Sequence, residues 1–395
     1  MAMNVEGPKY YDAVMGGHHA PPPGAAVLGG LTGIQTRLAV VDIPVKVAAL
    51  KEALNYGQAG LELVIDALKD DCQTVRRSAF LLLKHRTEPK AIAALKKFNP
   101  YRFFECVNTI QAHRSWVLSL AFSPTGRQIA SASKDKTIKL WVRDTGRKLY
   151  ILKGHSHWVS AVAYSPRSPI LVSGSWDYTI KLWQRLGESE LHSFPGESEI
   201  YAIAISPDGE FIAGGSGDKT IKLIDIAKKQ QVRTLVGHQG YAMAVAFSPN
   251  NQLVASGSSD KTIKLWHRET GRELYTLMGH GEQVCAIAFS PDGQILASSS
   301  FDKTINLWQV QTGRHICTLF GHTHWVYAIA FSPDGQTLAS CSRDNTVKLW
   351  QVKTGREIRT LEGHTRATCA VAFSPDGQTL ATGGDDGTIK IWEWH

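Results

Sequence analysis

Residues 321–350 read GHTHWVYAIAFSPDGQTLASCSRDNTVKLW, and this stretch returns along the chain in nearly the same form. The aspartate within it, Asp344, belongs to a series that recurs at intervals of 41 or 42 residues. The series is Asp135, Asp177, Asp218, Asp260, Asp302, Asp344 and Asp386. A fixed period of this length is the mark of a repeat architecture, so residues 104–395 are expected to form seven copies of one structural unit.

Each unit predicts four short β-strands. The segment VSAVAYSP at 159–166 alternates in the manner of a buried strand. The SPDG at 332–335 predicts a turn, with proline at its first corner and glycine at a positive-φ position. Two more strands follow, and a KTG turn at 353–355 leads into the fourth. Seven such sheets packed radially bury the faces that one sheet leaves open, which predicts an all-β seven-bladed β-propeller.

The pattern GH…SPDG…SxDxTIKLW resembles the WD-repeat β-propeller family across about residues 104–395. The run of near-identical repeats is similar to bacterial, especially cyanobacterial, WD-repeat proteins. The aspartate of the family's Trp-Asp dipeptide is mostly absent, as at Trp183-Gln184. Since that aspartate is not needed structurally, the resemblance still implies the propeller fold.

The resemblance also implies a buried hydrogen-bonded tetrad of His, Ser or Thr, Asp and Trp in most blades. The tetrads carried over are His113, Ser131, Asp135 and Trp141; His155, Ser173, Asp177 and Trp183; His238, Ser256, Asp260 and Trp266; His280, Ser298, Asp302 and Trp308; His322, Ser340, Asp344 and Trp350; and His364, Thr382, Asp386 and Trp392. Six copies at one spacing suit a scaffold, whereas a catalytic serine needs an exposed oxygen beside an oxyanion hole.

The third blade departs from the tetrad at three positions, with Gly196, Gly214 and Ile224 beside the retained Asp218. We expect it to be the weakest blade, held by packing alone. Its loops are either adapted to a partner or the product of sequence drift.

The first 98 residues precede the repeats. Residues 1–43 are rich in Gly and Pro and predict an extended arm, in which VLGGLTGIQTRL either docks as a short helix or does nothing. Residues 44–98 show apolar residues at helical spacing. Within them, ALKDDCQTVRRSAFLLL resembles a HEAT-type repeat of the short kind found in phycobilin-lyase-like proteins. The matching residues are Asp70, Val75, Arg76 and Ala79.

The propeller is expected to span residues 99–395 and to close its ring with an early strand. The last repeat stops at Trp392-Glu-Trp-His without a fourth strand, and residues 104–110 supply a matching one. This strand should complete the last blade and lock the ring.

In the family, partners bind mostly at one end of the central channel. The positions three residues past each His and just before each Asp vary between otherwise similar repeats, and they are rich in Trp, Tyr and Arg, which are frequent in interface hot spots. The candidate partner-binding residues are Trp116, Trp158, Trp176, Tyr241, Phe301, Trp325, Arg114, Arg343 and Arg366. The alternative is that the aromatic side chains only pack on neighbouring blades.

Composition limits the classes of function. The net charge of +8 is spread over regularly placed lysines of the DKTIKLW type, such as Lys139 and Lys264, which suggests strand edges. The six cysteines form no CxxC pair, no apolar run is long enough to span a bilayer, and no secretory signal is evident. Together with the resemblance, this composition leads us to expect a non-catalytic cytoplasmic scaffold, without cofactor or metal, that binds protein partners at the channel mouth, with the helical segment as a second contact. The alternatives are a nucleic-acid-binding propeller and, less favoured, an enzyme acting at the channel mouth.

Overall fold

The computed structural model describes residues 30–184 and 189–394. The chain separates into two compact units, a helical unit that ends at Phe103 and also includes Trp394, and a β-unit over Phe104–Glu393. Each unit has its own core, and each is described by itself below.

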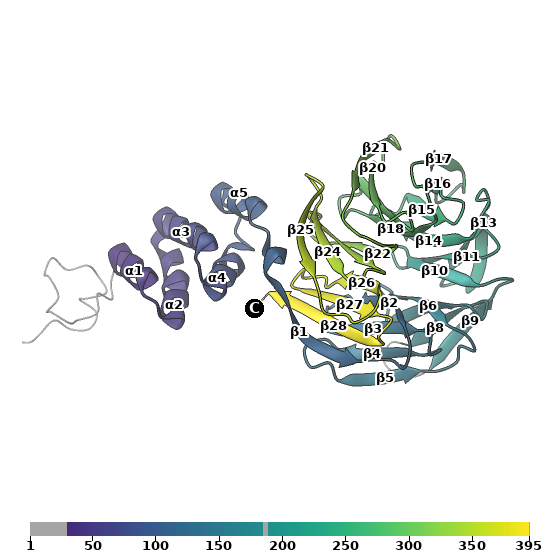
Figure 1. Ribbon diagram of the computed structural model, residues 1–395, viewed down its shortest axis with the longest axis horizontal. Helices are drawn as coiled ribbons and strands as arrows, with labels where there is room; N and C mark the ends of the chain where they lie inside the picture. The colour runs from purple at the N-terminus through teal and green to yellow at the C-terminus, as the bar shows by residue number, and fades with distance from the viewer. Residues whose placement is uncertain (1–29, 185–188, 395) are drawn as a thin grey trace, which may run out of the picture. The chain divides into compact units, whose positions relative to one another are not determined.

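The helical unit contains five α-helices over its described residues (Figure 1). They are α1 (Gly30–Ala39), α2 (Ile43–Ala53), α3 (Gly57–Asp66), α4 (Gln73–Leu83) and α5 (Pro89–Lys97). Short 3-10 turns lie at Leu54–Tyr56, Ala67–Lys69 and Pro100–Phe103. The arm does not stay extended up to residue 43: from residue 30 onward the alternative of a short docked helix is confirmed, because Ile34 of α1 is fully buried in the helical core. Residues 1–29 lie outside the described part of the chain.

Polar contacts hold the start of α2 and the turn before α4. The Asp42 side chain accepts a hydrogen bond from the Val45 backbone at 3.1 Å, which satisfies a free N–H in the first turn of α2. Asp70 accepts from Lys46 Nζ at 2.9 Å and from the Cys72 backbone at 2.8 Å. Arg76 donates to the Asp70 carbonyl at 2.5 Å. Through these contacts, Asp70 and Arg76 stabilise the turn that leads into α4.

The β-unit consists of seven four-stranded antiparallel sheets arranged as the blades of a propeller (Figure 1). The first strands of the blades gather around the centre of the ring: β2 (Val117–Phe122), β6 (Val159–Tyr164), β10 (Ile200–Ile205), β14 (Ala242–Phe247), β18 (Val284–Phe289), β22 (Val326–Phe331) and β26 (Thr368–Phe373). The second strands are β3 (Gln128–Ser133), β7 (Ile170–Ser175), β11 (Phe211–Ser216), β15 (Leu253–Ser258), β19 (Ile295–Ser300), β23 (Thr337–Ser342) and β27 (Thr379–Gly384).

The third strands are β4 (Ile138–Val142), β8 (Thr179–Gln184), β12 (Ile221–Asp225), β16 (Ile263–His267), β20 (Ile305–Gln309), β24 (Val347–Gln351) and β28 (Thr388–Trp394). They carry the tryptophans of the repeat, except β12, which has Ile224 in that position. The fourth strands lie at the outside of the blades: β5 (Lys148–Leu152), β9 (Glu190–Pro195), β13 (Gln230–Leu235), β17 (Glu273–Leu277), β21 (His315–Leu319), β25 (Arg356–Leu361) and, for the last blade, β1 (Phe104–Gln111). The seven blades agree with the seven repeats read from the sequence.

Local sequence explains the turns between strands. In blade six, Ser332 Oγ accepts a hydrogen bond from the Thr337 backbone at 3.0 Å, and Gly335 has φ +69°. Glycine adopts this left-handed conformation without the steric cost that other residues bear, so the SPDG turn joins the first two strands cleanly. A register shift between Val326 and Ala328 then changes the direction of the side chains at the start of the inner strand.

The ring is closed by pairing the beginning of the β-unit with its end. Strand β1 is hydrogen bonded to β28 at the outside of the last sheet. Beyond β1, the backbone N–H groups of Ala112 and His113 both donate to the Gly387 carbonyl, at 3.1 and 2.9 Å. Lys390 Nζ of β28 donates to Thr109 Oγ1 of β1 at 2.9 Å. Two segments far apart in sequence thus share one blade.

The regular lysines do not lie on strand edges, so that interpretation of their spacing is wrong. Lys181 and Lys264 lie on third strands, which have a neighbour on both sides. Their Nζ atoms pair with Glu190 and Glu273 of the fourth strand at 2.9 and 2.8 Å. These two lysines therefore pair with a neighbouring strand of the same blade. Other members of the series, Lys136, Lys219, Lys261 and Lys303, lie in the turns before the third strands.

Candidate functional site

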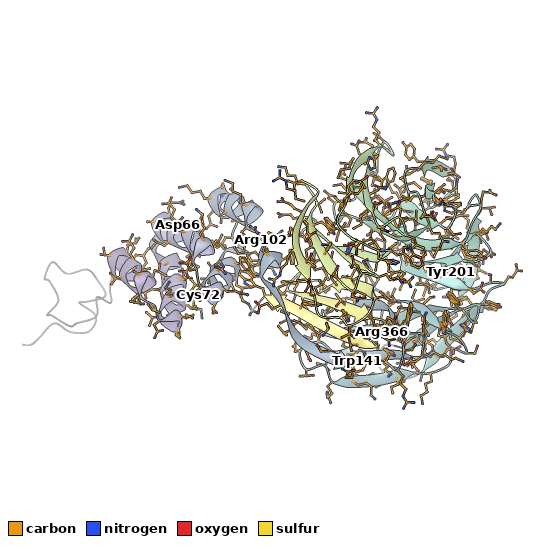
Figure 2. The ribbon with its side chains drawn as sticks, viewed as in Figure 1. Asp66, Cys72, Arg102, Trp141, Tyr201 and Arg366 are labelled. Atoms are coloured by element: carbon orange, nitrogen blue, oxygen red, sulfur yellow. The ribbon has the colours of Figure 1, made fainter. Side chains whose placement is uncertain are left out.

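Six blades contain the hydrogen-bonded tetrad. In blade four, Trp266 Nε1 donates to Ser256 Oγ at 2.8 Å, the serine lies 2.8 Å from His238 Nε2, and His238 Nδ1 lies 2.9 Å from Asp260 Oδ2. The same contacts recur in the blades of Trp141, Trp183, Trp308, Trp350 and Trp392. Trp141, labelled in Figure 2, lies on β4.

Electrostatics assign the donors and acceptors of the blade-four tetrad. Burial opposes the charge of Asp260, yet hydrogen bonds from Thr262 and the Gln239 backbone and the nearby His238 lower its pKa to about 2. Burial is the main cause that lowers the pKa of His238, so the imidazole is neutral at neutral pH. A neutral ring donates from Nδ1 to the carboxylate and accepts at Nε2 from the serine, which accepts from the tryptophan. Every polar side-chain group of this tetrad is then hydrogen bonded.

This arrangement makes the tetrads structural. Ser256, His238 and Trp266 are all buried, so no substrate reaches the serine oxygen. That oxygen is already engaged by the two neighbouring rings. The tetrad therefore contains the residue types of a Ser-His-Asp triad, but its serine is not accessible to a substrate.

Blade three keeps a reduced polar network, so the expectation that packing alone holds it is wrong. Asp218 Oδ1 accepts from the backbone and hydroxyl of Thr220 at 2.9 and 2.6 Å. Its other oxygen pairs with Lys222 Nζ at 2.9 Å, in a place where no histidine competes for it. The Ile180 side chain of blade two packs toward Gly214, where a Cβ atom would lie 2.6 Å from Ile180 Cδ1.

The variable positions of the repeat form one surface, here called the channel mouth. One set immediately precedes the inner strands: Trp116, Trp158, Glu199, Tyr241, Gln283, Trp325 and Ala367. The other set follows the second strands: Lys134, Trp176, Gly217, Ser259, Phe301, Arg343 and Asp385. In every blade the carbonyl of the first set accepts a hydrogen bond from the backbone N–H of the second, at 2.8–3.1 Å. The backbone therefore places the two sets side by side at one end of the inner strands.

Aromatic rings run across the mouth from blade one to blade four. Lys134 Nζ lies 3.3 Å from the ring centroid of Trp116 and 4.3 Å from that of Trp158. The Trp158 and Trp176 centroids are 4.6 Å apart. Tyr201 continues the row, 5.3 Å from Trp176 and 5.7 Å from Tyr241. Tyr241 is 48% exposed, and the tryptophans are half-buried.

A second aromatic group lies in blades five and six. The rings of Phe301 and Trp325 stack at 4.3 Å, and the Arg343 guanidinium lies 4.6 Å from the Trp325 centroid. Tyr327 approaches Phe301 edge-on at 5.9 Å. Stacked rings that also hold a cation form a rigid surface with a fixed positive charge.

Two of the three predicted arginines lie apart from the rings. Arg114 and Arg366 belong to the exposed turns after His113 and His364, and their side chains are exposed. Figure 2 labels Arg366 and, on β10, Tyr201. The aromatic positions and Arg343 are brought together as described, while these two arginines are exposed charges in the turns of blades one and seven.

Sequence reasoning missed Tyr201 and Tyr327. Each lies two residues beyond a predicted mouth position, at Glu199 and Trp325. Register shifts at Ile200/Ala202 and Val326/Ala328 interrupt the alternation of side chains at these two tyrosines, so the strand period alone does not place them. Lys134 directly precedes Asp135 in the sequence, but its contact with two tryptophans needs the folded ring.

Burial also tunes the polar groups near the mouth. Burial lowers the pKa of Lys134. It raises the pKa of Tyr327 to about 12 and that of Cys369 to about 12. The phenol and the thiol are therefore neutral at neutral pH, and the thiol is a poor nucleophile because only the thiolate is reactive.

A seven-bladed ring with repeated His-Ser-Asp-Trp tetrads defines a propeller of the WD-repeat class. The family model "WD domain, G-beta repeat" matches residues 104–142, 146–184 and 188–225, and the model "WDR3 first beta-propeller domain" matches residues 225–394. The chain belongs to the WD-repeat β-propeller family. Members of this family are commonly protein-interaction scaffolds, and the fold is generally non-catalytic.

Individual relatives are similar only over short stretches. The chain is 51% identical over 41 residues to the vegetative incompatibility protein HET-E-1 of Podospora anserina, covering 10% of this chain and 3% of that protein. It is 30% identical over 102 residues to the E3 ubiquitin-protein ligase TRAF7 of mouse and of human, covering 23% of this chain and 17% and 15% of theirs. The chain thus spans less than a fifth of each relative.

Two further observations concern the described residues. Within 30–184 and 189–394, no group of three or more His, Cys, Asp or Glu side chains is arranged to hold a metal ion. Across the same part of the chain, every helix is too short or too polar to cross a membrane.

Proposed function

We propose that this protein is a non-catalytic scaffold that binds a protein partner at the channel mouth. One observation carries the proposal. The repeats are nearly identical elsewhere, yet their mouth positions differ and place half-exposed aromatic rings beside one another across blades one to four. Ordered aromatic side chains give large contact area at little entropic cost, which suits the centre of an interface.

The charges at the mouth indicate the chemistry of the partner. Lys134 and Arg343 lie over tryptophan rings, and Arg114 and Arg366 are exposed in the adjoining turns. Guanidinium groups bind carboxylates through paired hydrogen bonds. A partner segment with apolar side chains flanked by acidic residues fits this surface best.

The alternatives have less support from the same surface. The lysines that give the chain its positive charge are spread around all blades and several are paired with glutamates. A nucleic-acid surface would gather them on one face. Catalysis at the mouth would need a reactive polar group there, and Tyr327 and Cys369 are held neutral.

Affinity capture from a source-cell lysate tests the proposal. The baits are the wild type, a mouth variant (Trp116→Ala, Trp158→Ala and Trp325→Ala) and a control variant at the fourth strands of blades four and five (Met278→Ala, Ile316→Ala and Phe320→Ala). These outer residues are 50–76% exposed, so the control also removes apolar surface. Both variants must melt like the wild type.

Proteins captured by the wild type and the control variant but lost from the mouth variant are the expected result. Equal capture by all three baits contradicts a site at the mouth. Capture of nucleic acid that is released steeply by salt would instead support the nucleic-acid alternative.

A further inference from the structure

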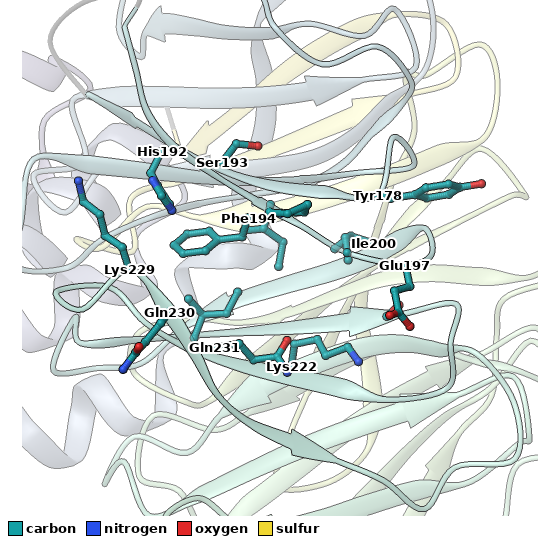
Figure 3. A pocket seen from close by; sticks show the side chains of 15 residues that line it. Tyr178, His192, Ser193, Phe194, Glu197, Ile200, Lys222, Lys229, Gln230 and Gln231 are labelled. Atoms are coloured by element: carbon teal, nitrogen blue, oxygen red, sulfur yellow. The ribbon is translucent and has the colours of Figure 1, made fainter.

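A cavity of about 240 Å³ lies between blades two and three (Figure 3). Blade two contributes Ile180 of β8 and the end of β9, including Phe194. Blade three contributes Ile200 of β10, Ile224 of β12 and Gln231 of β13. The cavity opens to solvent between the outer parts of the two blades.

The cavity lies where blade three lacks its tetrad. Gly196 stands in the register position of the histidine, Gly214 in that of the serine and Ile224 in that of the tryptophan. Gly196 and Ile224 line the cavity directly. Each of the other six blades fills the corresponding space with an indole ring bonded to a hydroxyl group.

The residue at the position before the tetrad histidine indicates that the tryptophan ring is what blade three lacks. In blade two a Cβ atom on Gly154 would lie 3.1 Å from Trp183 Cη2, so only a small residue fits beside the tryptophan, and the corresponding residue of blade one is Ala112. The same close approach recurs at Gly237, Gly279, Gly321 and Gly363. In blade three this position is Pro195, and the larger residue is accommodated because no indole ring opposes it.

The walls and the ends of the cavity differ in chemistry. Phe194, Ile180, Ile200 and Ile224 make the walls apolar. Figure 3 shows Lys229 at one end, near His192, and Glu197 at the other end, near Tyr178. An apolar cavity of about 150 Å³ is large enough for a benzene ring, so the volume here admits an indole.

We infer that this cavity binds a tryptophan side chain of a partner protein, in a segment that carries an acidic residue on one side of the tryptophan and a basic residue on the other. The indole takes the place that Trp183, Trp266 and their counterparts fill in the other blades. The flanking charges meet Lys229 and Glu197. This site is independent of the channel mouth and gives the scaffold a second contact on the side of the ring.

Methyl NMR of the full chain titrated with N-acetyl-tryptophanamide tests the inference. We expect saturable shifts of the Ile180 and Ile200 δ-methyl signals, with Ile263, which holds the place of Ile180 in blade four, unchanged. N-acetyl-leucinamide should bind at least tenfold more weakly. Shifts caused by free indole but not by the amide would overturn a partner side chain as the occupant, and no shift with the amide would overturn the site.

Variants that fill the cavity from within complete the test. Ile224→Trp supplies the missing ring, and Ile224→Phe is a smaller replacement in case the tryptophan meets Pro195. In a variant whose Ile263 signal remains at its wild-type position, the amide should bind at least tenfold more weakly. The mouth variant (Trp116→Ala, Trp158→Ala and Trp325→Ala) should bind the amide like the wild type. Unchanged affinity in both filled variants would overturn the inference.

Discussion

Ser298 and Ser299 are neighbours on β19 whose buried hydroxyls differ in hydrogen bonding. Both side chains are fully buried. Ser298 Oγ lies 2.8 Å from both Trp308 Nε1 and His280 Nε2, whereas Ser299 Oγ has no hydrogen-bond partner among the described residues. A buried polar group stabilises the fold only where it is paired, so these two serines separate the effect of the tetrad from that of burial.

Replacing each serine by alanine should therefore give different results. Ser298→Ala leaves two buried groups unpaired, at a cost of about 1–3 kcal/mol for each. Ser299→Ala should leave the free energy of unfolding unchanged or slightly raised. Urea unfolding measures both. Equal losses for the two variants would mean that the tetrad hydrogen bonds contribute nothing beyond packing.

The tetrad carboxylates should make stability depend on acid. The pKa of Asp260 is about 2 in the folded chain, below its ordinary value of 3.8, and the pKa values of Asp135, Asp177, Asp302, Asp344 and Asp386 are lowered too. A lowered carboxyl pKa stabilises the fold above the ordinary value, and this stability is lost as the pH falls through the folded value.

The melting temperature should accordingly fall as the pH is lowered from 5 to 3, and an Asp260→Asn variant should show a shallower decrease. Calorimetry at a series of pH values checks both statements. A melting temperature that is flat over this range would contradict the electrostatic description of the tetrads.

Among the structural elements, β1 is the strand that closes the ring. It supplies the outer strand of the last blade and covers the edge of β28. An uncovered strand edge presents unpaired backbone groups that pair readily with another chain. Two truncations that differ only by this strand, one starting at Phe104 and the other at residue 112, isolate its contribution.

We expect the shorter truncation product to melt at a lower temperature and to associate in solution, while the longer one remains a monomer. Scanning calorimetry and light scattering measure these properties. If both truncations melt alike and stay monomeric, closure by β1 does not stabilise the ring.

Blade three should open more easily than blade four. It lacks the His, Ser and Trp of the tetrad and keeps only the contacts of Asp218 with Thr220 and Lys222. Hydrogen exchange of the amides in β12 and β13 is therefore expected to be faster than in the equivalent strands β16 and β17. Mass spectrometry of exchanged peptides compares the two blades within one sample, and equal protection would contradict a weaker third blade.

The sequence predicts the strands of the seven repeats well, and the elements outside the repeats less well. Seven copies in register define all blades, and the missing fourth strand of the last repeat points to the strand before the first. For α1 the sequence leaves a short docked helix and an extended arm open, because Gly29 and Gly30 beside the Pro-rich stretch favour an extended chain, and only the folded core shows Ile34 buried. The lysines were misplaced because their spacing does not reveal which strand of a sheet has two neighbours.

At the scale of the whole molecule, one rigid ring carries surfaces that differ from blade to blade. The tetrads and the closing strand keep the blades alike inside, so the mouth positions are free to differ without cost to the fold. This division explains why the mouth residues vary in type around the ring while six of the seven blades keep the tetrad. The positions of the mouth were predictable from this variation, but their contacts depend on ring geometry that no linear spacing encodes.

Site-specific photo-crosslinking tests the central claim, that the mouth is where a protein partner binds. A photoreactive phenylalanine is placed at Tyr241 in one protein and at Ile316 of the outer strand β21 in another, positions that are 48% and 50% exposed. After irradiation in source-cell lysate, the account predicts a discrete protein adduct from position 241 and none from position 316. Adducts from position 316 alone, or the same adducts from both, would contradict it.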